Sequence, residues 1–208
     1  MNVVPRIHIV TNDEILERPD FIHHAAVFPD TDTVLHIRST TLPGRKLQNI
    51  VNNLRRAGLQ TPIIINDRVD VAVAVNAAGV HLPERGLPVK RVRAEFDDSL
   101  LIGRSTHTPE AACQATDDGA DYAFLGPIWP TPSHPHAATL GLDALQTVKA
   151  GRILAIGGIT PERAASCIGA GAYGVAVISA IWNAPEPASV ARTFVSIIKE
   201  TTTTDSAV

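Results

Sequence analysis

Two short turns late in the chain have the composition of a phosphate-binding site. Gly157 and Gly158 follow an apolar, strand-like run and precede a helix start, and Ile178 and Ser179 follow the next such run. Glycine lets backbone N–H groups come close to an anion, and the first turn of a helix attracts negative charge. We therefore predict that these four residues bind phosphate; the alternative is that the glycines only form a tight turn.

Polar side chains also follow several of the earlier apolar runs. His36 and Arg38 are two residues apart in one run, so in a strand both side chains point the same way. An unpaired buried arginine is costly, so Arg38 should meet a ligand anion or an internal carboxylate, and His36 a hydrogen-bond partner. Asn66, His81 and Ser105 stand at the ends of three later runs. We predict that all five residues bind substrate.

The loop of residues 127–137 is rich in proline and contains two histidines, His134 and His136. Histidine changes its charge near neutral pH and is the commonest acid/base group in enzymes. We predict that this loop forms a lid or wall of the site, that His134 and His136 transfer protons, and that Thr131 and Ser133 bind substrate beside them. Solvent-exposed histidines without a catalytic role are the alternative.

Asp67, directly after Asn66, has two interpretations. Its carboxylate could hold a cation, or it could cap the helix that follows. The sequence contains no His-Glu-x-x-His motif, no Cys-His cluster and no Walker-type phosphate loop. These observations predict no metal site and no cofactor.

Eight apolar runs rich in β-branched residues must position these groups, and helical patterns separate them. The runs begin near residues 6, 34, 62, 79, 100, 122, 153 and 174, a mean spacing of 24 residues. Each interval can hold one helix and two loops, as in a parallel sheet covered by helices. We predict a single (β/α)8 TIM barrel, an α/β fold with eight parallel strands, whose site lies at the C-terminal strand ends. A doubly wound sheet is the alternative.

Local signals set helix starts and the extent of the domain. Thr108-Pro109 and Thr160-Pro161 each combine an N-cap residue with a proline at the first helical position. We place the barrel at residues 1–199. The remaining segment, 200–208, is threonine-rich without an apolar face, so we predict a disordered tail.

The composition limits the class of protein. The chain has 208 residues, 45% of them hydrophobic, and a net charge of -3. Its basic residues are scattered, which argues against a nucleic-acid partner, and no run of 18 apolar residues could span a membrane. The first residues lack the apolar core of a signal peptide, so we expect a cytoplasmic protein. Homo-oligomerisation is left open.

The chain from Arg6 to Ala188 resembles the thiamine phosphate synthase/TenI superfamily. The resemblance rests on motifs in a fixed order: HIR, INDRVD, GVHLPERGLP, IGRSTHTPEAA, GADYAFLGPIWPT, AIGGITPERA and GAYGVAVISAI. It implies a (β/α)8 barrel whose AIGG and VISAI turns bind the phosphate of a small phosphorylated thiazole ligand, in agreement with the turns identified above.

Synthases of this superfamily join a pyrimidine diphosphate to the thiazole phosphate and release diphosphate with the help of Mg²⁺. Here Thr40, Gly86 and His134 stand where the resemblance implies a lysine, an aspartate and a second lysine, and His36 replaces a glutamine. Other synthase positions match, namely Arg38, Asn66, Asp67, Ser105 and Thr131. If the chain is a synthase, Asp67 would hold the Mg²⁺.

TenI-type thiazole tautomerases are similar in His36-Ile37-Arg38 and in the segments HLP and GRS, and their proton transfer needs no metal. Their catalytic histidine, however, corresponds to Pro127 here. From the sequence we favour a thiazole tautomerase-like isomerase that aromatises a thiazole carboxylate phosphate, with His134 or His136 as the proton-transferring group. The alternatives are a thiamine phosphate synthase with atypical residues and a non-catalytic regulator that binds thiamine precursors.

Overall fold

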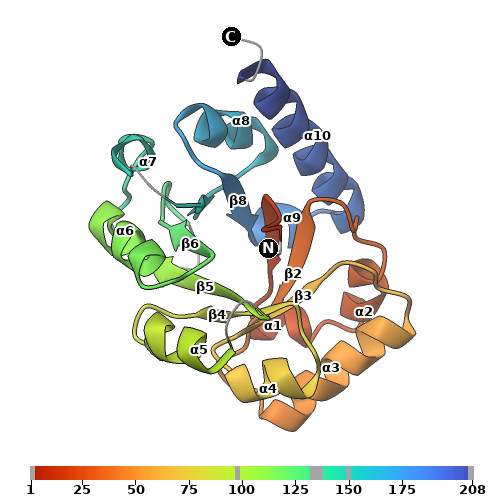
Figure 1. Ribbon diagram of the computed structural model, residues 1–208. Helices are drawn as coiled ribbons and strands as arrows, with labels where there is room; N and C mark the ends of the chain where they lie inside the picture. The colour runs from red at the N-terminus through yellow and green to blue at the C-terminus, as the bar shows by residue number, and fades with distance from the viewer. Residues whose placement is uncertain (1–2, 97–98, 132–137, 149–150, 206–208) are drawn as a thin grey trace.

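The computed structural model of the chain describes residues 3–96, 99–131, 138–148 and 151–205. Eight parallel strands pair in sequence order, and β8 pairs with β1, so the sheet closes into a barrel (Figure 1). The predicted (β/α)8 TIM barrel is confirmed, and the doubly wound sheet is wrong. The strands are β1 (Ile7–Val10), β2 (Thr33–Ile37), β3 (Ile63–Asn66), β4 (Gly79–Leu82), β5 (Leu101–Thr106), β6 (Tyr122–Leu125), β7 (Ile153–Ile156) and β8 (Gly174–Val177).

Helices surround the barrel and cover the outer faces of its strands (Figure 1). α10 packs against α8 and α9, and α8 also packs against β8. The helices are α1 (Asp13–Leu16), α2 (Phe21–Ala25), α3 (Gly44–Arg56), α4 (Val69–Ala74), α5 (Val89–Phe96), α6 (Pro109–Asp117), α7 (Asp143–Thr147), α8 (Pro161–Gly169), α9 (Ser179–Trp182) and α10 (Pro187–Asp205). Within the described residues, no helix is both long and apolar enough to cross a membrane.

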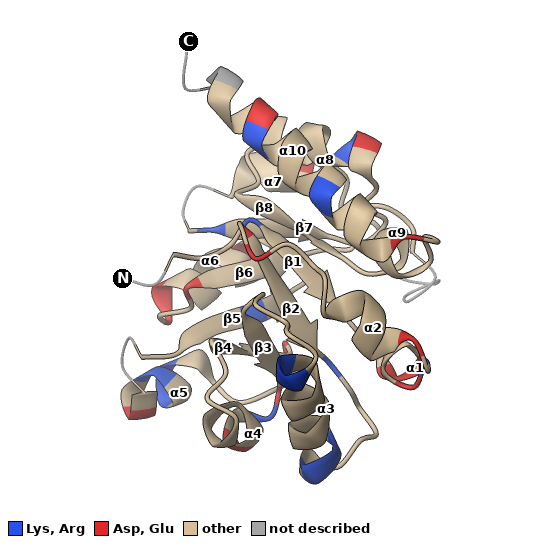
Figure 2. Ribbon diagram, turned by 90° about the vertical axis from the view of Figure 1, so that its right-hand side faces the viewer, with Lys and Arg blue, Asp and Glu red and all other residues tan. Residues whose placement is uncertain are grey.

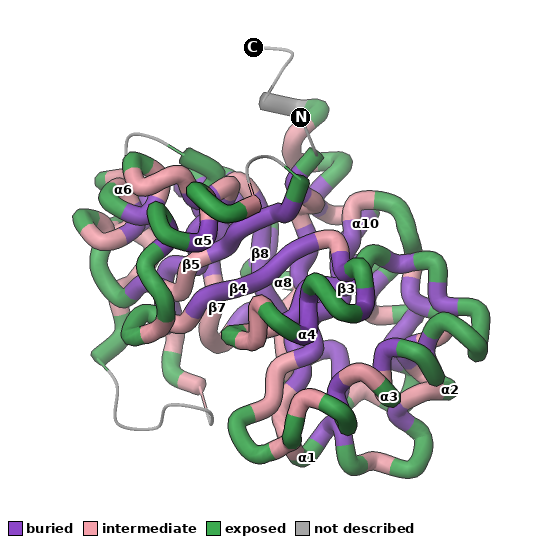
Figure 3. Tube along the Cα trace, turned by 60° about the horizontal axis from the view of Figure 1, so that its bottom comes forward, coloured by how far each residue is buried: buried purple, intermediate pink, exposed green. Residues whose placement is uncertain are grey.

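Burial explains why the strands are nearly continuous apolar runs. In Figure 3 the strands are buried, whereas the outer surfaces of the helices are exposed. Outward-facing strand residues pack under the helices, and a second apolar cluster that includes Val34, Ile64 and Leu154 fills the barrel. Parallel strands covered on both faces require apolar residues at successive positions. Figure 2 shows acidic and basic residues interspersed along the helices.

The barrel interior contains imidazole and phenol groups as well as aliphatic side chains. His8, His36, His81 and Tyr122 are all fully buried or nearly so. Gly103 provides the space for the phenol ring, because a Cβ at this position would lie 2.1 Å from Cζ of Tyr122. The interior is thus packed with polar aromatic groups, each of which requires a hydrogen-bond partner.

Residues that precede β1 and β8 fasten the barrel where these two strands meet. The Arg6 guanidinium donates to the carbonyl of Tyr173 at 2.8 Å and lies 4.5 Å from the centre of its ring. The Tyr173 hydroxyl in turn donates to the carbonyl of Val4 at 2.5 Å. Residues 167 positions apart in the sequence therefore hold the closing pair of strands together.

The predicted helix starts are correct. Thr108 caps α6 by accepting a hydrogen bond from the N–H of Ala111 at 3.1 Å, and Thr160 is the N-cap residue of α8, although its side chain makes no capping hydrogen bond. The predicted disordered tail, however, has to be corrected for residues 200–205, because α10 continues to Asp205, and residues 206–208 lie outside the described residues. Hydroxyls at Thr201, Thr202 and Thr203 bond to carbonyls one turn earlier, as at Thr201, whose hydroxyl donates to Ile197 at 2.8 Å. Threonine hydroxyls that form such bonds do not offer the backbone an alternative to its helical hydrogen bonds.

Candidate active site

The two predicted phosphate turns lie side by side at the C-terminal end of the barrel. Ile156 pairs with Ala176, so the turn of Gly157 and Gly158 is adjacent to that of Ile178 and Ser179. Within the described residues, the backbone N–H groups of Gly158 and Ser179 donate no hydrogen bond. Two open donors on neighbouring turns, one of them at a helix start, can accept an anion between them.

Both glycines are also required by the fold. Gly157 and Gly158 have φ values of +95° and +66°. A Cβ on Gly157 would lie 2.6 Å from Cβ of Pro127, and one on Gly158 would lie 2.7 Å from Cβ of Trp129. The Trp129 N–H also donates to the carbonyl of Gly157 at 3.1 Å. The two glycines therefore do form a tight turn, as the alternative interpretation predicts. The turn still leaves the N–H of Gly158 without an acceptor among the described residues.

Arg163 from α8 restrains the same turn. Its guanidinium donates to the carbonyl of Gly158 at 2.7 Å and lies 4.9 Å from the centre of the Trp129 ring. A trans peptide directs its C=O and N–H to opposite sides. The N–H of Ile159 therefore points away from the Arg163 side chain, and the orientation of this peptide is fixed before any ligand arrives.

Beneath the mouth, His36 takes part in a buried chain of hydrogen bonds. Its Nδ1 lies 3.0 Å from the Asn66 side-chain oxygen, and its Nε2 lies 2.8 Å from Nδ1 of His8. Nε2 of His8 lies 3.0 Å from the carbonyl of Pro5. Burial lowers the pKa of His36 to about 4, against the opposing effect of Asn66. His36 is thus a neutral interior group that supports the mouth from below.

His81 connects the interior to the mouth on the opposite side. Its Nε2 lies 2.8 Å from the hydroxyl of Ser105, and its Nδ1 lies 3.2 Å from the hydroxyl of Tyr122. Burial, followed by the charges of His36 and His8, lowers the pKa of His81 well below its ordinary value. The structure therefore brings the predicted residues His81 and Ser105 together in direct contact.

Arg38 follows β2 at the mouth, and its side chain is half-buried. Its backbone N–H donates to the hydroxyl of Thr11 at 2.9 Å. No carboxylate forms an ion pair with its guanidinium anywhere in the described part of the chain. Of the two partners expected for Arg38, the internal carboxylate is therefore absent from these residues, and a ligand anion remains.

An unpredicted carboxylate contacts the loop that follows this arginine. Asp13, at the start of α1, accepts hydrogen bonds from the hydroxyls of Thr40 and Thr41, both at 2.8 Å, and from the hydroxyl of Ser39. Desolvation acts in the opposite direction, but these hydrogen bonds hold the pKa of Asp13 well below its usual range. The loop after β2 is thus fastened to α1, and an anionic group lies where the resemblance implies a lysine.

Asp67 occupies a strained turn after β3. Its φ is +64°, and the N–H of Arg68 donates across it to the carbonyl of Asn66 at 2.8 Å, which closes a γ-turn. A non-glycine residue in this region is uncommon and costs about 1–3 kcal/mol. The capping role for Asp67 is wrong, because Arg68 is the N-cap residue of α4, without a side-chain capping bond. The exposed Asp67 carboxylate is therefore available to a cation.

The turn after β4 has a backbone hydrogen bond in place of a second carboxylate. The N–H of Gly86 donates to the carbonyl of Pro83 at 2.8 Å. Arg104 holds the same turn by donating to the carbonyls of Leu87, at 2.8 Å, and Glu84. In the residues that the structure describes, no group of three or more His, Cys, Asp or Glu side chains could hold a metal ion.

The loop after β6 is described only in part. Thr131 is half-buried and follows the segment that packs on the phosphate turn. Ser133, His134 and His136 lie outside the described residues, so their predicted roles stay predictions. One histidine that we did not predict does lie at this rim, since Nδ1 of His107 is 2.6 Å from the carbonyl of Gly126. Its position two residues after Ser105 could have identified it.

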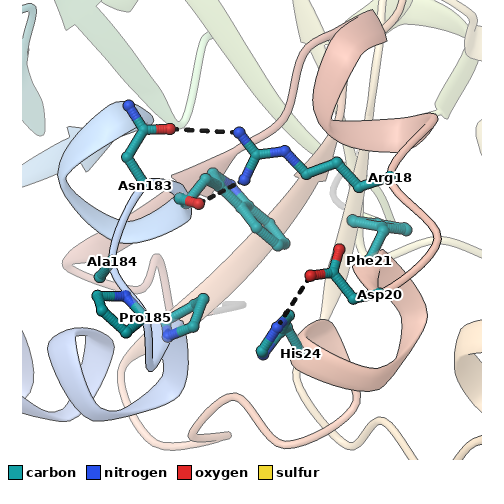
Figure 4. Close-up of a pocket in the computed structure, with 9 residues that line it drawn as sticks. Arg18, Asp20, Phe21, His24, Asn183, Ala184 and Pro185 are labelled. Carbon is teal, nitrogen blue, oxygen red and sulfur yellow. Dashed lines mark hydrogen bonds and ion pairs between the residues drawn. The ribbon is translucent and has the colours of Figure 1, made fainter.

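A separate hollow of about 440 Å³ lies between α2 and the end of α9 (Figure 4). Arg18 donates to the carbonyl of Trp182 and, at 3.3 Å, to Oδ1 of Asn183, while His24 lies 3.3 Å from Asp20. These polar groups have one another as partners. The residues that line the hollow include Trp182 and Asn183, at the opposite end of α9 from Ser179. The hollow is thus distinct from the mouth.

Comparisons with known proteins agree with this geometry. A family profile described as thiamine monophosphate synthase matches residues 7–181. A thiamine-phosphate synthase of Roseiflexus castenholzii is 39% identical over 82% of this chain and 77% of its own. Another, of Chloroflexus aurantiacus, is 44% identical over 71% of this chain and 68% of its own. The solved thiamine phosphate pyrophosphorylase of Pyrococcus furiosus has a TM-score of 0.80 and 29% identity, and the match covers 94% and 96% of the two chains.

Proposed function

The chain belongs to the thiamine phosphate synthase/TenI superfamily of thiamine-biosynthesis enzymes, and on that premise we propose that it forms thiamine phosphate. From the sequence we favoured the isomerase, but relatives at 39–44% identity that cover most of the chain carry the name thiamine-phosphate synthase. This likeness supports the synthase over the isomerase, and it is the observation that carries the proposal.

The proposed reaction joins two substrates at the mouth of the barrel. A thiazole ring nitrogen attacks the methylene carbon of a pyrimidine methyl diphosphate. The new N–C bond forms while the C–O bond to diphosphate breaks, the electron pair leaves with diphosphate, and the thiazole becomes a cation. No proton has to move. The protein must therefore hold the thiazole phosphate, align the pyrimidine and stabilise negative charge on the departing group.

We propose that each region of the mouth performs a part of this work. The open N–H groups of Gly158 and Ser179 bind the thiazole phosphate. Asn66 and Ser105, held from below by His36 and His81, line the place where the pyrimidine would rest. Arg38, which has no carboxylate partner within the described residues, binds the diphosphate as a fixed cation.

Synthases of this kind require Mg²⁺, which stabilises the charge of the diphosphate. Mg²⁺ keeps several waters and usually takes only one or two carboxylates, with substrate phosphates as further ligands. The exposed carboxylate of Asp67 fits this requirement, and Gly86 offers no second one. We propose that Asp67 is the protein ligand and that the remaining ligands are diphosphate oxygens and water.

The test is a coupled assay with both substrates and Mg²⁺, in which diphosphate and thiamine phosphate are measured together. Asp67→Ala should lower kcat/KM at least about a hundredfold, because metal charge stabilisation contributes several kcal/mol. Asp70→Ala removes a nearby exposed carboxylate, which pairs with Arg68, and is the matched control. Absence of product in the wild-type protein, with the thiazole phosphate still bound, would overturn the synthase.

One observation keeps the isomerase as a second candidate. Thr40 is bonded to Asp13, and Gly86 closes a turn, so two groups that would manage diphosphate are missing at the mouth. A proton transfer within a thiazole carboxylate phosphate would not need them. Conversion of that compound to its aromatic form, with solvent deuterium entering the product, would support this activity. Binding without either reaction would instead indicate the non-catalytic regulator.

A further inference from the structure

The chain of hydrogen bonds from Pro5 to Asn66 has a direction that its end groups determine. It runs from the carbonyl of Pro5 to Nε2 of His8, from Nδ1 of His8 to Nε2 of His36, and from Nδ1 of His36 to the Asn66 amide. The two imidazoles are fully buried, so no water can substitute for a missing partner. Every nitrogen in the chain must therefore be matched with a complementary group.

Counting protons fixes the tautomers. A backbone carbonyl can only accept, so Nε2 of His8 carries the hydrogen that points to Pro5. Nδ1 of a neutral His8 then accepts, and Nε2 of His36 is its donor. Nδ1 of a neutral His36 must also accept. The Asn66 atom that faces it must therefore be the amide nitrogen, which a half-turn of the side chain exchanges with the oxygen seen at 3.0 Å.

Neutral rings are favoured by the surroundings of both histidines. Burial, together with the neighbouring His36, lowers the pKa of His8 well below its ordinary value, although the Pro5 carbonyl opposes the shift. The only other way to satisfy the chain is an extra proton shared by the two rings, with the Asn66 oxygen accepting from His36. That state places a positive charge in the barrel interior beside the aromatic rings of Tyr122 and Phe124.

The orientation of the Asn66 amide matters at the mouth. Asn66 is two residues beyond Ile64, the strand partner of His36, so His36 lies below it and the opposite edge of its amide faces the mouth. That edge has no hydrogen-bond partner among the described residues. With the nitrogen turned inward, the group exposed to a ligand is an oxygen, which accepts a hydrogen bond and cannot donate one.

We propose that His8 is a positioning residue which, through His36, turns the Asn66 oxygen toward the mouth, so that this position selects a ligand that donates an N–H. His8 itself lies one layer too deep to touch a ligand. The ligand part of the proposal rests on the proposed function, because an amino group on the pyrimidine is the donor that the oxygen would meet. The tautomer part stands on the hydrogen-bond chain alone.

His81 is an internal contrast within the same barrel. Its neighbours, the hydroxyls of Tyr122 and Ser105, can each either donate or accept. Neither tautomer of His81 is therefore imposed by its partners. Only the chain that ends on the Pro5 carbonyl has a fixed direction, which is why the proposal concerns His8 and His36.

Nitrogen-15 NMR of the histidine rings tests the tautomers in the whole protein without any ligand. We expect both His8 and His36 to be neutral at pH 7 with hydrogen on Nε2. His8→Leu removes the acceptor of the His36 Nε2–H, so hydrogen should appear on Nδ1 of His36 instead. His8→Asn, which has nearly the same size as leucine and retains an acceptor near the position of Nδ1, should keep hydrogen on Nε2 of His36. Hydrogen on Nδ1 of His36 in the wild-type protein would by itself overturn the proposal, even if neither variant folds.

The coupled assay tests the ligand part separately. For the aminopyrimidine diphosphate, His8→Leu should lower kcat/KM about tenfold, the effect of one misdirected hydrogen bond, and His8→Asn should restore most of it. Equal kcat/KM in the two variants would overturn the role in selection. If the wild-type protein makes no product at all, the proposed function fails, whereas the NMR result still decides whether His8 sets the orientation of Asn66.

Discussion

The hydroxyl of Thr40 donates to the carboxylate of Asp13 at 2.8 Å, and this pair joins the loop after β2 to α1 at the mouth of the barrel. Synthases of the superfamily are expected to have a lysine at this position. The chain therefore has an anion with three hydroxyl partners at a place where a diphosphate would need a cation. We expect the negative charge of Asp13 to weaken the binding of a diphosphate at this part of the mouth.

Thr40→Lys should improve the proposed synthase reaction. An ammonium group next to Asp13 would neutralise the carboxylate and add a charge-assisted hydrogen bond to diphosphate, about 1.5–3 kcal/mol. We expect kcat/KM for the pyrimidine diphosphate to rise about tenfold in the steady-state assay, mainly through a lower KM. Thr41→Lys, one residue further along the same exposed loop, is the control, and an equal gain in both variants would contradict this explanation.

Asp13 should also make stability depend on acidity. Its folded-state pKa is depressed, so its stabilising effect is present above the unfolded pKa of about 3.9 and is lost as the pH falls below it. We expect Asp13→Asn to unfold at lower urea concentration than the wild-type protein at pH 7, with the gap narrowing toward pH 3. Glu14→Gln, a neighbouring exposed carboxylate, should show no such gap. A gap that stays constant with pH would indicate lost packing instead.

The buried histidines should make the stability of the fold depend on pH in a second, less acidic range. Burial lowers the pKa of His36 to about 4, below an unfolded value of about 6.5. Stability is therefore full above about 6.5 and falls as the pH drops toward 4, at up to about 1.4 kcal/mol per pH unit for one group. Urea unfolding at pH 7 and pH 5 should show the loss, and His36→Gln should reduce it. An unchanged slope in that variant would exclude His36 as its source.

Gly158→Ala should damage both the fold and the phosphate site. A Cβ at φ +66° is strained and would meet Trp129 at 2.7 Å, so we expect a loss of about 1–3 kcal/mol. Thermal unfolding should shift by roughly 2–4 °C per kcal/mol. Gly169→Ala is the matched control, because a Cβ there meets nothing within 4 Å. Calorimetric titration with the thiazole phosphate should show weaker binding for Gly158→Ala only, and equal affinities would argue against this turn as the phosphate site.

The positions of the strands and of the two turns after β7 and β8 could be predicted because they depend on local patterns. Apolar runs repeated at regular spacing identified all eight strands, and the glycines after β7 identified the turn. The parity of His36 and Arg38 predicted only that both side chains point the same way, and the structure shows that His36 lies in the interior.

Contacts between distant segments could not be predicted in this way. His8 has the same setting as His36, a histidine in an apolar run, but its role depends on the register of β1 with β2. Asp13 meets Ser39 across 26 residues, and neither the spacing nor the residue types around Asp13 indicate this. Our proposal of a synthase rather than an isomerase likewise rests on the relatives, because both activities would use the same two turns.

The contact of Arg6 with Tyr173 has a consequence for how the protein is made. During synthesis β1 leaves the ribosome before all the other strands, whereas its neighbour β8 is the last strand to be made. Until that strand has left the ribosome, β1 has an unpaired edge, and the turn of Ile178 and Ser179 does not yet exist. The mouth of the barrel is therefore one of the last parts to form, and a nascent chain shorter than about residue 180 should bind no ligand.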